Sequence, residues 1–105
     1  MKESTVEQYL VDQVKALGGE VRKVKWIGRN GAPDRLVMLP HDLDTTHGCY
    51  APNTIWVELK NPDTILTFPS GPHERQQHRE HERMRAMGQR VEVIGTKEGV
   101  DALLA

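Results

Sequence analysis

The sequence predicts an α/β domain in which helices flank a mixed β-sheet. Helical periodicity alternates with short β-branched and apolar runs, in the order α-β-β-β-α-β-α. The first three strands can pair as an antiparallel meander, because only turns or loops separate them. A helix separates the third strand from the fourth, and such a crossover predicts that these two strands are parallel.

Composition limits the size of the protein and its partners. A chain of 105 residues predicts one domain over 1–105. The net charge of −1 gives no global attraction for nucleic acid, so DNA binding would need local basic patches. The single cysteine, Cys49, excludes an internal disulfide and favours a reducing, cytoplasmic compartment. No stretch reaches membrane-spanning length, and we expect no signal peptide.

The first helix is expected from Ser4 to Leu17, before the Gly18-Gly19 pair. Its apolar stripe consists of Val6, Leu10, Val14 and Leu17. Ser4 followed by Glu7 matches a capping box. Glu7 therefore has two interpretations at this point, a helix cap or a member of a functional site.

Two strands are expected next, at 20–26 and 35–39, and Asn30-Gly31 between them predicts a hairpin turn. Pro33 precedes the second strand, where its missing N–H does no harm, and Asp34 begins that strand. The polar connection over 40–52 follows. Its residues His41, His47 and Cys49 could bind zinc, but a fourth ligand is not obvious, and a solvated loop is the alternative.

The third strand, Thr54 to Lys60, is an apolar run interrupted by two ionisable residues, Glu58 and Lys60. Residues two apart on a strand point to the same face. Burying a carboxylate and an ammonium there costs free energy unless they are partnered or used. The Pro-rich segment that follows, Asn61 to Pro72, predicts a loop.

The second helix, 73–87, is highly charged and has a thin apolar stripe of Met84 and Met87, with Gln77 or His81 also facing inward. His78 and His81 lie one turn apart and could share a metal. A solvated or DNA-facing pair is the alternative. A half-buried strand is expected at 90–94, and a last helix at 97–104, capped by Thr96.

Asp34 and the Glu58-Leu59-Lys60 run stand at the ends of two strands that can be neighbours. Carboxylates suit Mg²⁺, and a nearby lysine can orient water or stabilise developing charge, so the set favours metal-dependent phosphodiester hydrolysis. A structural alternative is a rim salt bridge between Glu58 and Lys60, with Asp34 as a turn cap.

Pro33-Asp34 with the Glu-x-Lys of Glu58 to Lys60 resembles the PD-(D/E)XK nuclease superfamily, which has a restriction-endonuclease-like core. Collinear features resemble its VRR-NUC branch, of the stand-alone phage or bacterial type. They are a helix glutamate (Glu7), Gly31 to Asp34, the Glu-x-Lys, a glutamine on the next helix (Gln77, or Gln76), then Gly88 and a strand. The segment 41–53 departs from this pattern by lengthening the gap between the two motifs.

The resemblance implies an endonuclease dependent on Mg²⁺ or Mn²⁺, in a bacterial cell or phage-infected host. It implies metal ligands at Asp34, Glu58, the Leu59 carbonyl and Glu7, with Lys60 and Gln77 assisting. It further implies branched DNA such as a Holliday junction as substrate, and a homodimer. The alternatives are a non-catalytic DNA-binding or adaptor module, and a nuclease for flap or linear DNA with a helicase partner. Basic residues expected to contact DNA are Arg22, Lys23, Lys25, Arg29, Arg35, Arg75, Arg79 and Arg83.

Overall fold

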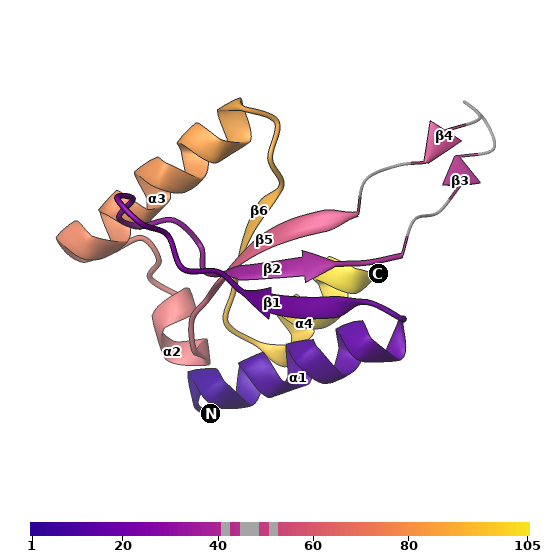
Figure 1. Ribbon diagram of the computed structural model, residues 1–105. Helices are drawn as coiled ribbons and strands as arrows, with labels where there is room; N and C mark the ends of the chain where they lie inside the picture. Colours follow the sequence, from indigo (N-terminus) through magenta and orange to yellow (C-terminus); the bar gives the residue numbers. More distant parts are fainter. Residues whose placement is uncertain (41–42, 45–48, 51–52) are drawn as a thin grey trace.

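A four-stranded mixed sheet with the order β1-β2-β5-β6 organises the computed structural model, which describes residues 1–40, 43–44, 49–50 and 53–105 (Figure 1). The strands β1 (Glu20–Lys23), β2 (Arg35–Met38) and β5 (Thr54–Leu59) pair as an antiparallel meander. The fourth, β6 (Val91–Ile94), is parallel to β5. The predicted fold class and strand directions are therefore confirmed. Two short strands, β3 (Leu43–Asp44) and β4 (Cys49–Tyr50), pair antiparallel in a separate two-stranded sheet.

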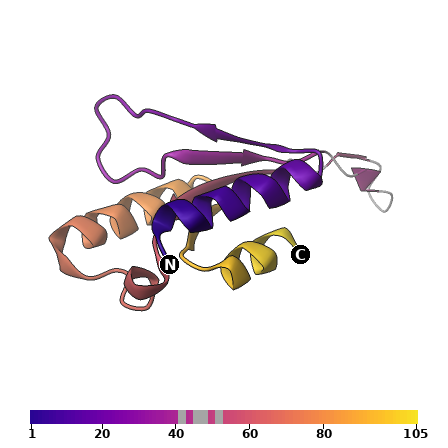
Figure 2. The same cartoon turned by 90° about the horizontal axis from the view of Figure 1, so that it is seen from below.

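Two helices cover one face of the sheet. They are α1 (Glu3–Ala16) and α4 (Lys97–Leu104), which lie side by side in Figure 2. The core between them and the sheet includes Leu10, Val57 and Val100, all fully buried. Strand alternation points Ile55, Val57 and Leu59 into this core. The even-numbered residues of β5 are thereby directed to the other face, where α3 (Gly71–Ala86) lies.

The prediction of a capping box at the start of α1 is wrong. The helix begins at Glu3 with Lys2 as its N-cap, and no side chain caps it. Glu7 instead contacts Arg35 across the domain, which a local pattern cannot reveal. Val6, Leu10 and Val14 are buried as predicted, but Leu17 is 52% exposed because the helix ends at Ala16.

β1 and β2 form the predicted antiparallel hairpin, but a short turn at Asn30-Gly31 does not join them. β1 stops at Lys23, and a loop over 24–34 joins it to β2 and reaches α3. Gly31 has φ +84°, and a Cβ there would lie 3.1 Å from the Gln77 Cα, so glycine permits both the backbone conformation and the close approach. Trp26 Nε1 donates to the Pro33 carbonyl at 2.8 Å across this loop.

The segment predicted to be a loop over 61–72 contains a short helix, α2 (Pro62–Ile65). Asn61 caps it by accepting from the Asp63 and Thr64 N–H groups, and Thr64 returns a bond to the Asn61 backbone. Proline is favoured at the first helical position, so Pro62 begins this helix rather than preventing it.

The remaining helices agree closely with expectation. Gln77, His81 and Met84 of α3 face inward, whereas Met87 lies past the end of the helix and is 68% exposed. Thr96 caps α4 by accepting from the Gly99 N–H at 2.9 Å. Within the described ranges, no helix has the length and apolar character needed to cross a membrane. The zinc hypothesis at His41, His47 and Cys49 concerns side chains outside the described part of the chain.

Candidate active site

Asp34, directly before β2, and Glu58 of β5 lie at the same end of two neighbouring strands. The antiparallel register pairs Arg35 with Val57, so its continuation by one residue sets Asp34 opposite Glu58. Residues opposite one another on such strands have Cβ atoms about 4.5–5.5 Å apart. The Glu58 side chain is 11% exposed and that of Asp34 is 59% exposed, so this pair of carboxylates has one buried and one accessible member.

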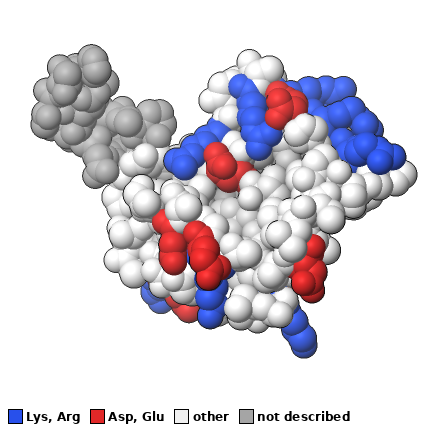
Figure 3. All heavy atoms as spheres, turned by 180° about the vertical axis from the view of Figure 1, so that it is seen from behind, with Lys and Arg blue, Asp and Glu red and all other residues white. Residues whose placement is uncertain are grey.

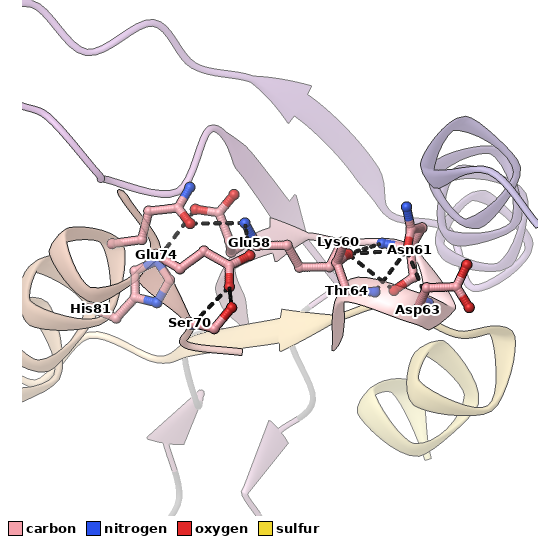
Figure 4. A network of polar contacts seen from close by, with 9 residues as sticks. Glu58, Lys60, Asn61, Asp63, Thr64, Ser70, Glu74 and His81 are labelled. Atoms are coloured by element: carbon pink, nitrogen blue, oxygen red, sulfur yellow. Dashed lines mark hydrogen bonds and ion pairs between the residues drawn. The ribbon is translucent and has the colours of Figure 1, made fainter. Parts of the chain in front are cut away.

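Lys60 is held by partners on α3 (Figure 4). Its Nζ donates to Gln77 Oε1 at 2.8 Å and lies 3.3 Å from Glu74 Oε2. The same nitrogen lies 5.2 Å from the centre of the Phe68 ring. The Ser70 backbone N–H and then the Lys60 ammonium lower the pKa of Glu74. Lys60 is therefore fixed by side chains that sequence reasoning only partly identified, with Gln77 rather than Gln76 as its amide partner.

Glu58 makes its side-chain contact with His81, not with Lys60. His81 Nε2 lies 3.4 Å from Glu58 Oε1, and the imidazole is fully buried and stacked on Phe68 with 6.0 Å between ring centres. The solvated or DNA-facing pair considered for His78 and His81 is therefore wrong for His81. The rim salt bridge considered between Glu58 and Lys60 is absent from the ion pairs of the described residues.

Arg35 joins Glu7 to Asp34. One guanidinium nitrogen donates to Glu7 Oε2 at 2.6 Å, and another lies 2.8 Å from Asp34 Oδ1. Burial lowers the pKa of Arg35, but the hydrogen bonds and charges of Glu7 and Asp34 outweigh it and raise that pKa overall. Lys23 also approaches Glu7, at 3.7 Å. From the sequence, Arg35 was expected only to contact DNA. Its side chain is instead 12% exposed and is bonded to the carboxylates of two candidate site residues.

The donor set suits a hard divalent cation. Asp34 and Glu58 provide carboxylate oxygens from adjacent strands, and Mg²⁺ takes one or two carboxylates while retaining waters. Over the described ranges, no three His, Cys, Asp or Glu side chains are grouped as metal ligands, and the oxygens of Glu7 are turned to Arg35. Asp34, Glu58 and the Leu59 carbonyl would thus hold the ion, and Glu7 would join only by leaving Arg35 or through water.

Basic side chains gather over α3, as Figure 3 shows in blue. Arg75 and Arg79 are exposed on this helix, and Lys25 is exposed on the 24–34 loop. Arg22 is bonded to Glu20 at 2.6 Å, and that pair is largely exposed. Arg29 differs, because it makes two hydrogen bonds to the buried Glu80, at 3.0 and 2.8 Å. The exposed basic residues on α3 and the 24–34 loop form a local basic surface. A protein with a net charge of −1 needs such a surface to attract DNA.

Sequence reasoning missed Glu74, Glu80 and Phe68 as parts of this region. Glu74, Gln77 and His81 are spaced i, i+3 and i+7, so they lie along one face of α3. That spacing, taken with Lys60, could have identified Glu74 as a partner. Glu80 and Phe68 had no comparable signal, because their partners are distant in sequence.

The Glu80–Arg29 ion pair should make stability pH-dependent. Arg29, by hydrogen bonding first and charge second, lowers the pKa of Glu80. The pair therefore adds to the free energy of unfolding above the pKa of about 4.3 that the carboxyl has in the unfolded chain. This added stability is lost as the pH falls through the lower pKa that Glu80 has in the folded protein. The urea midpoint of Glu80→Gln should therefore lie well below that of the wild type at pH 7, and this gap should narrow at pH 3. Glu82→Gln is the control, since its pair with Arg85 is exposed and contributes little. A gap of constant size would contradict this assignment.

Comparison with known proteins identifies the family. No family model matches the chain. A protein of Acyrthosiphon pisum secondary endosymbiont phage 1, named "Putative nuclease p44", is 35% identical over 98 residues, which cover 93% of this chain and 87% of that protein. A solved structure described as "VRR_NUC domain" has 38% sequence identity and a TM-score of 0.70, covering 99% of this chain and 95% of that chain. The sequence identity, the coverage and the shared fold together establish that this chain belongs to the VRR-NUC family of nucleases.

Proposed function

We propose that this protein is a metal-dependent DNA endonuclease that cuts branched DNA. The observation that carries the proposal is Lys60, a nearly buried lysine fixed by Gln77 and Glu74 beside Glu58, with Asp34 on the adjacent strand. Removing this ammonium from water costs free energy, and an apolar side chain at the same position would stabilise the fold without that cost. Phosphodiester hydrolysis uses such a group, because negative charge develops during the reaction.

Each residue has a distinct role in this proposal. Asp34, Glu58 and the Leu59 carbonyl bind Mg²⁺ or Mn²⁺, which when bound polarises a phosphoryl oxygen and acidifies water. Lys60 orients the attacking water and stabilises the developing charge, and Gln77 orients the Lys60 ammonium. His81 fixes the Glu58 carboxylate from its buried side. Glu7 serves the site when it is released from Arg35.

The proposed substrate is branched DNA such as a Holliday junction, cut by a homodimer in the cytoplasm of a bacterial cell or phage-infected host. A two-fold symmetric dimer would present two sites to the two strands of a junction. The basic side chains on α3 and the 24–34 loop favour contact with phosphates on the face that carries Glu58 and Lys60. The phage protein named as a nuclease supports the family-level chemistry and the proposed setting.

Cleavage assays test the substrate and the metal together. A four-way junction should be cut faster than linear duplex, single strand and flap of matching sequence, with Mg²⁺ or Mn²⁺ and not with chelator. Asp34→Ala should abolish cutting, because it removes one of two carboxylates for the ion. Asp12→Ala, at an exposed position on α1, is the control and should cut normally.

Other outcomes of the assay would identify the alternatives. Equal cutting of all substrates would retain the nuclease and contradict the junction preference. Faster cutting of flap or linear DNA would favour a nuclease that works with a helicase partner. Metal-loaded protein that binds DNA and cuts nothing would favour the non-catalytic binding module.

A further inference from the structure

A second concave site lies on the same face of the sheet as Glu58. It is a hollow of about 570 Å³ bounded by β5, the 24–34 loop and α3. Its apolar lining consists of Trp26, Trp56, Met84 and Met87. These are the only two tryptophans of the chain. A half-exposed aromatic hollow of this kind suits a planar apolar group.

Both indole rings line the hollow, and the N–H group of each ring is already bonded within the protein. Trp26 Nε1 donates to the Pro33 carbonyl at 2.8 Å, and Trp56 Nε1 donates to Gln89 Oε1 at 3.1 Å. The ring centres are 5.2 Å apart and the planes are inclined by 47°. With both N–H groups occupied, the rings offer stacking surface rather than hydrogen bonds, so they would accept planar ligands with little regard to their edges.

The rim of the hollow is positively charged. Arg29 and Arg83 line it together with Glu80. Glu80 makes two hydrogen bonds to Arg29 and lies 3.5 Å from Arg83, so two guanidinium groups share one carboxylate. This leaves a net charge of +1 beside the apolar walls. The matching ligand is a planar ring that carries negative charge next to it, which describes a nucleotide.

Trp56 connects this hollow to the candidate active site. It lies two residues before Glu58 on β5, so both side chains point to the same face at a spacing of about 7 Å along the strand. A DNA strand that ran along β5 past Lys60 and Glu58 would therefore reach the hollow within the next nucleotide positions.

We propose that this hollow binds an unpaired base of the DNA substrate next to the cut phosphodiester. This inference rests on the proposed nuclease function and names the feature of DNA that the enzyme recognises. Bases in an intact duplex are stacked on both faces and cannot enter, whereas a base at a branch point or in a single strand can do so at low cost. Stacking is also tolerant of base identity, so the hollow would select DNA structure rather than sequence.

Tryptophan fluorescence tests the inference without cleavage, because both tryptophans line the hollow. In the presence of chelator, a short oligothymidylate should quench the tryptophan fluorescence of the metal-free protein. An abasic oligonucleotide of equal length and charge should quench it much less. Trp56→Leu should weaken oligothymidylate binding about 5- to 150-fold, the range observed for losing one stacked base. The affinity of Trp56→Leu for blunt duplex should differ from that of the wild type by less than twofold. Trp56→Phe should keep most of the wild-type affinity for oligothymidylate. Circular dichroism confirms that each variant is folded.

The results separate this inference from the proposed function, because the binding assay needs neither metal nor cutting. Equal quenching by the abasic oligonucleotide, or an equal loss of duplex binding in Trp56→Leu, would overturn the base site even if the enzyme cuts junctions. Fluorescence that changes on protein dilution and does not respond to oligothymidylate would also overturn it, because a second copy would then occupy the hollow in place of a base. Base-dependent quenching by a protein that cuts nothing would retain the site and reject the nuclease.

Discussion

Replacing Lys60 with alanine should lower the rate of DNA cleavage by about 100- to 10,000-fold, the range expected when a positioned proton-transfer or charge-stabilising group is removed. The Lys60 ammonium is fixed by Gln77 at 2.8 Å and Glu74 at 3.3 Å, so it is preorganised before substrate arrives. Alanine removes that charge without a new side chain to take its place. Single-turnover cleavage of the preferred substrate at saturating Mg²⁺ measures the effect on chemistry separately from DNA binding.

Lys97→Ala is the matched control for this substitution. Lys97 also lies over an aromatic ring, with its Nζ 5.4 Å from the centre of Tyr9, compared with 5.2 Å between Lys60 and Phe68. It begins α4, on the opposite face of the sheet from Glu58. Lys97→Ala should therefore cut at the wild-type rate. Equal rates for Lys60→Ala and Lys97→Ala would rule out a catalytic role for Lys60 and leave it as a structural ion pair.

The parts of the site that follow from strand geometry were predictable from sequence. The strand period of two predicted that Glu58 of β5 and Lys60, directly after β5, share one face. The meander brought Asp34, directly before β2, to the same end of the sheet. The crossover helix set β6 parallel to β5. Each of these steps depends on local pattern or on general rules of chain connection, which a single sequence displays.

The partners of the site residues were not predictable, because they depend on side chains that meet only after folding. The local sequence predicted that Glu7 caps the first helix. Its carboxylate instead binds Arg35, which is distant in sequence. Arg35 itself was expected to face DNA, since a basic residue near a catalytic motif carries no mark of burial. The hairpin of β1 and β2 is closed not by a short turn at Asn30-Gly31 but by a longer loop that packs on α3. In each case a long-range contact overrode a favourable local pattern.

Leu10→Ala should lower the free energy of unfolding by about 2–5 kcal/mol, the usual cost of removing a buried leucine from a core. Leu10 is fully buried between α1 and the sheet, and its neighbours cannot fill the space without shifting. Small domains are stable by about 5–15 kcal/mol, so this single change removes a large share of the total. Urea unfolding at neutral pH, with equal slopes for wild type and variant, measures it.

Leu17→Ala provides a control of identical chemistry on the same chain segment. Leu17 is 52% exposed after the end of α1, so its truncation should change stability by less than about 0.5 kcal/mol. The comparison also bears on function, because α1 carries Glu7 one turn before Leu10 and thereby holds its carboxylate against Arg35. If Leu10→Ala and Leu17→Ala destabilised the protein equally, α1 would not be anchored by its buried stripe. The packing of α1 could then not be what sets the position of Glu7.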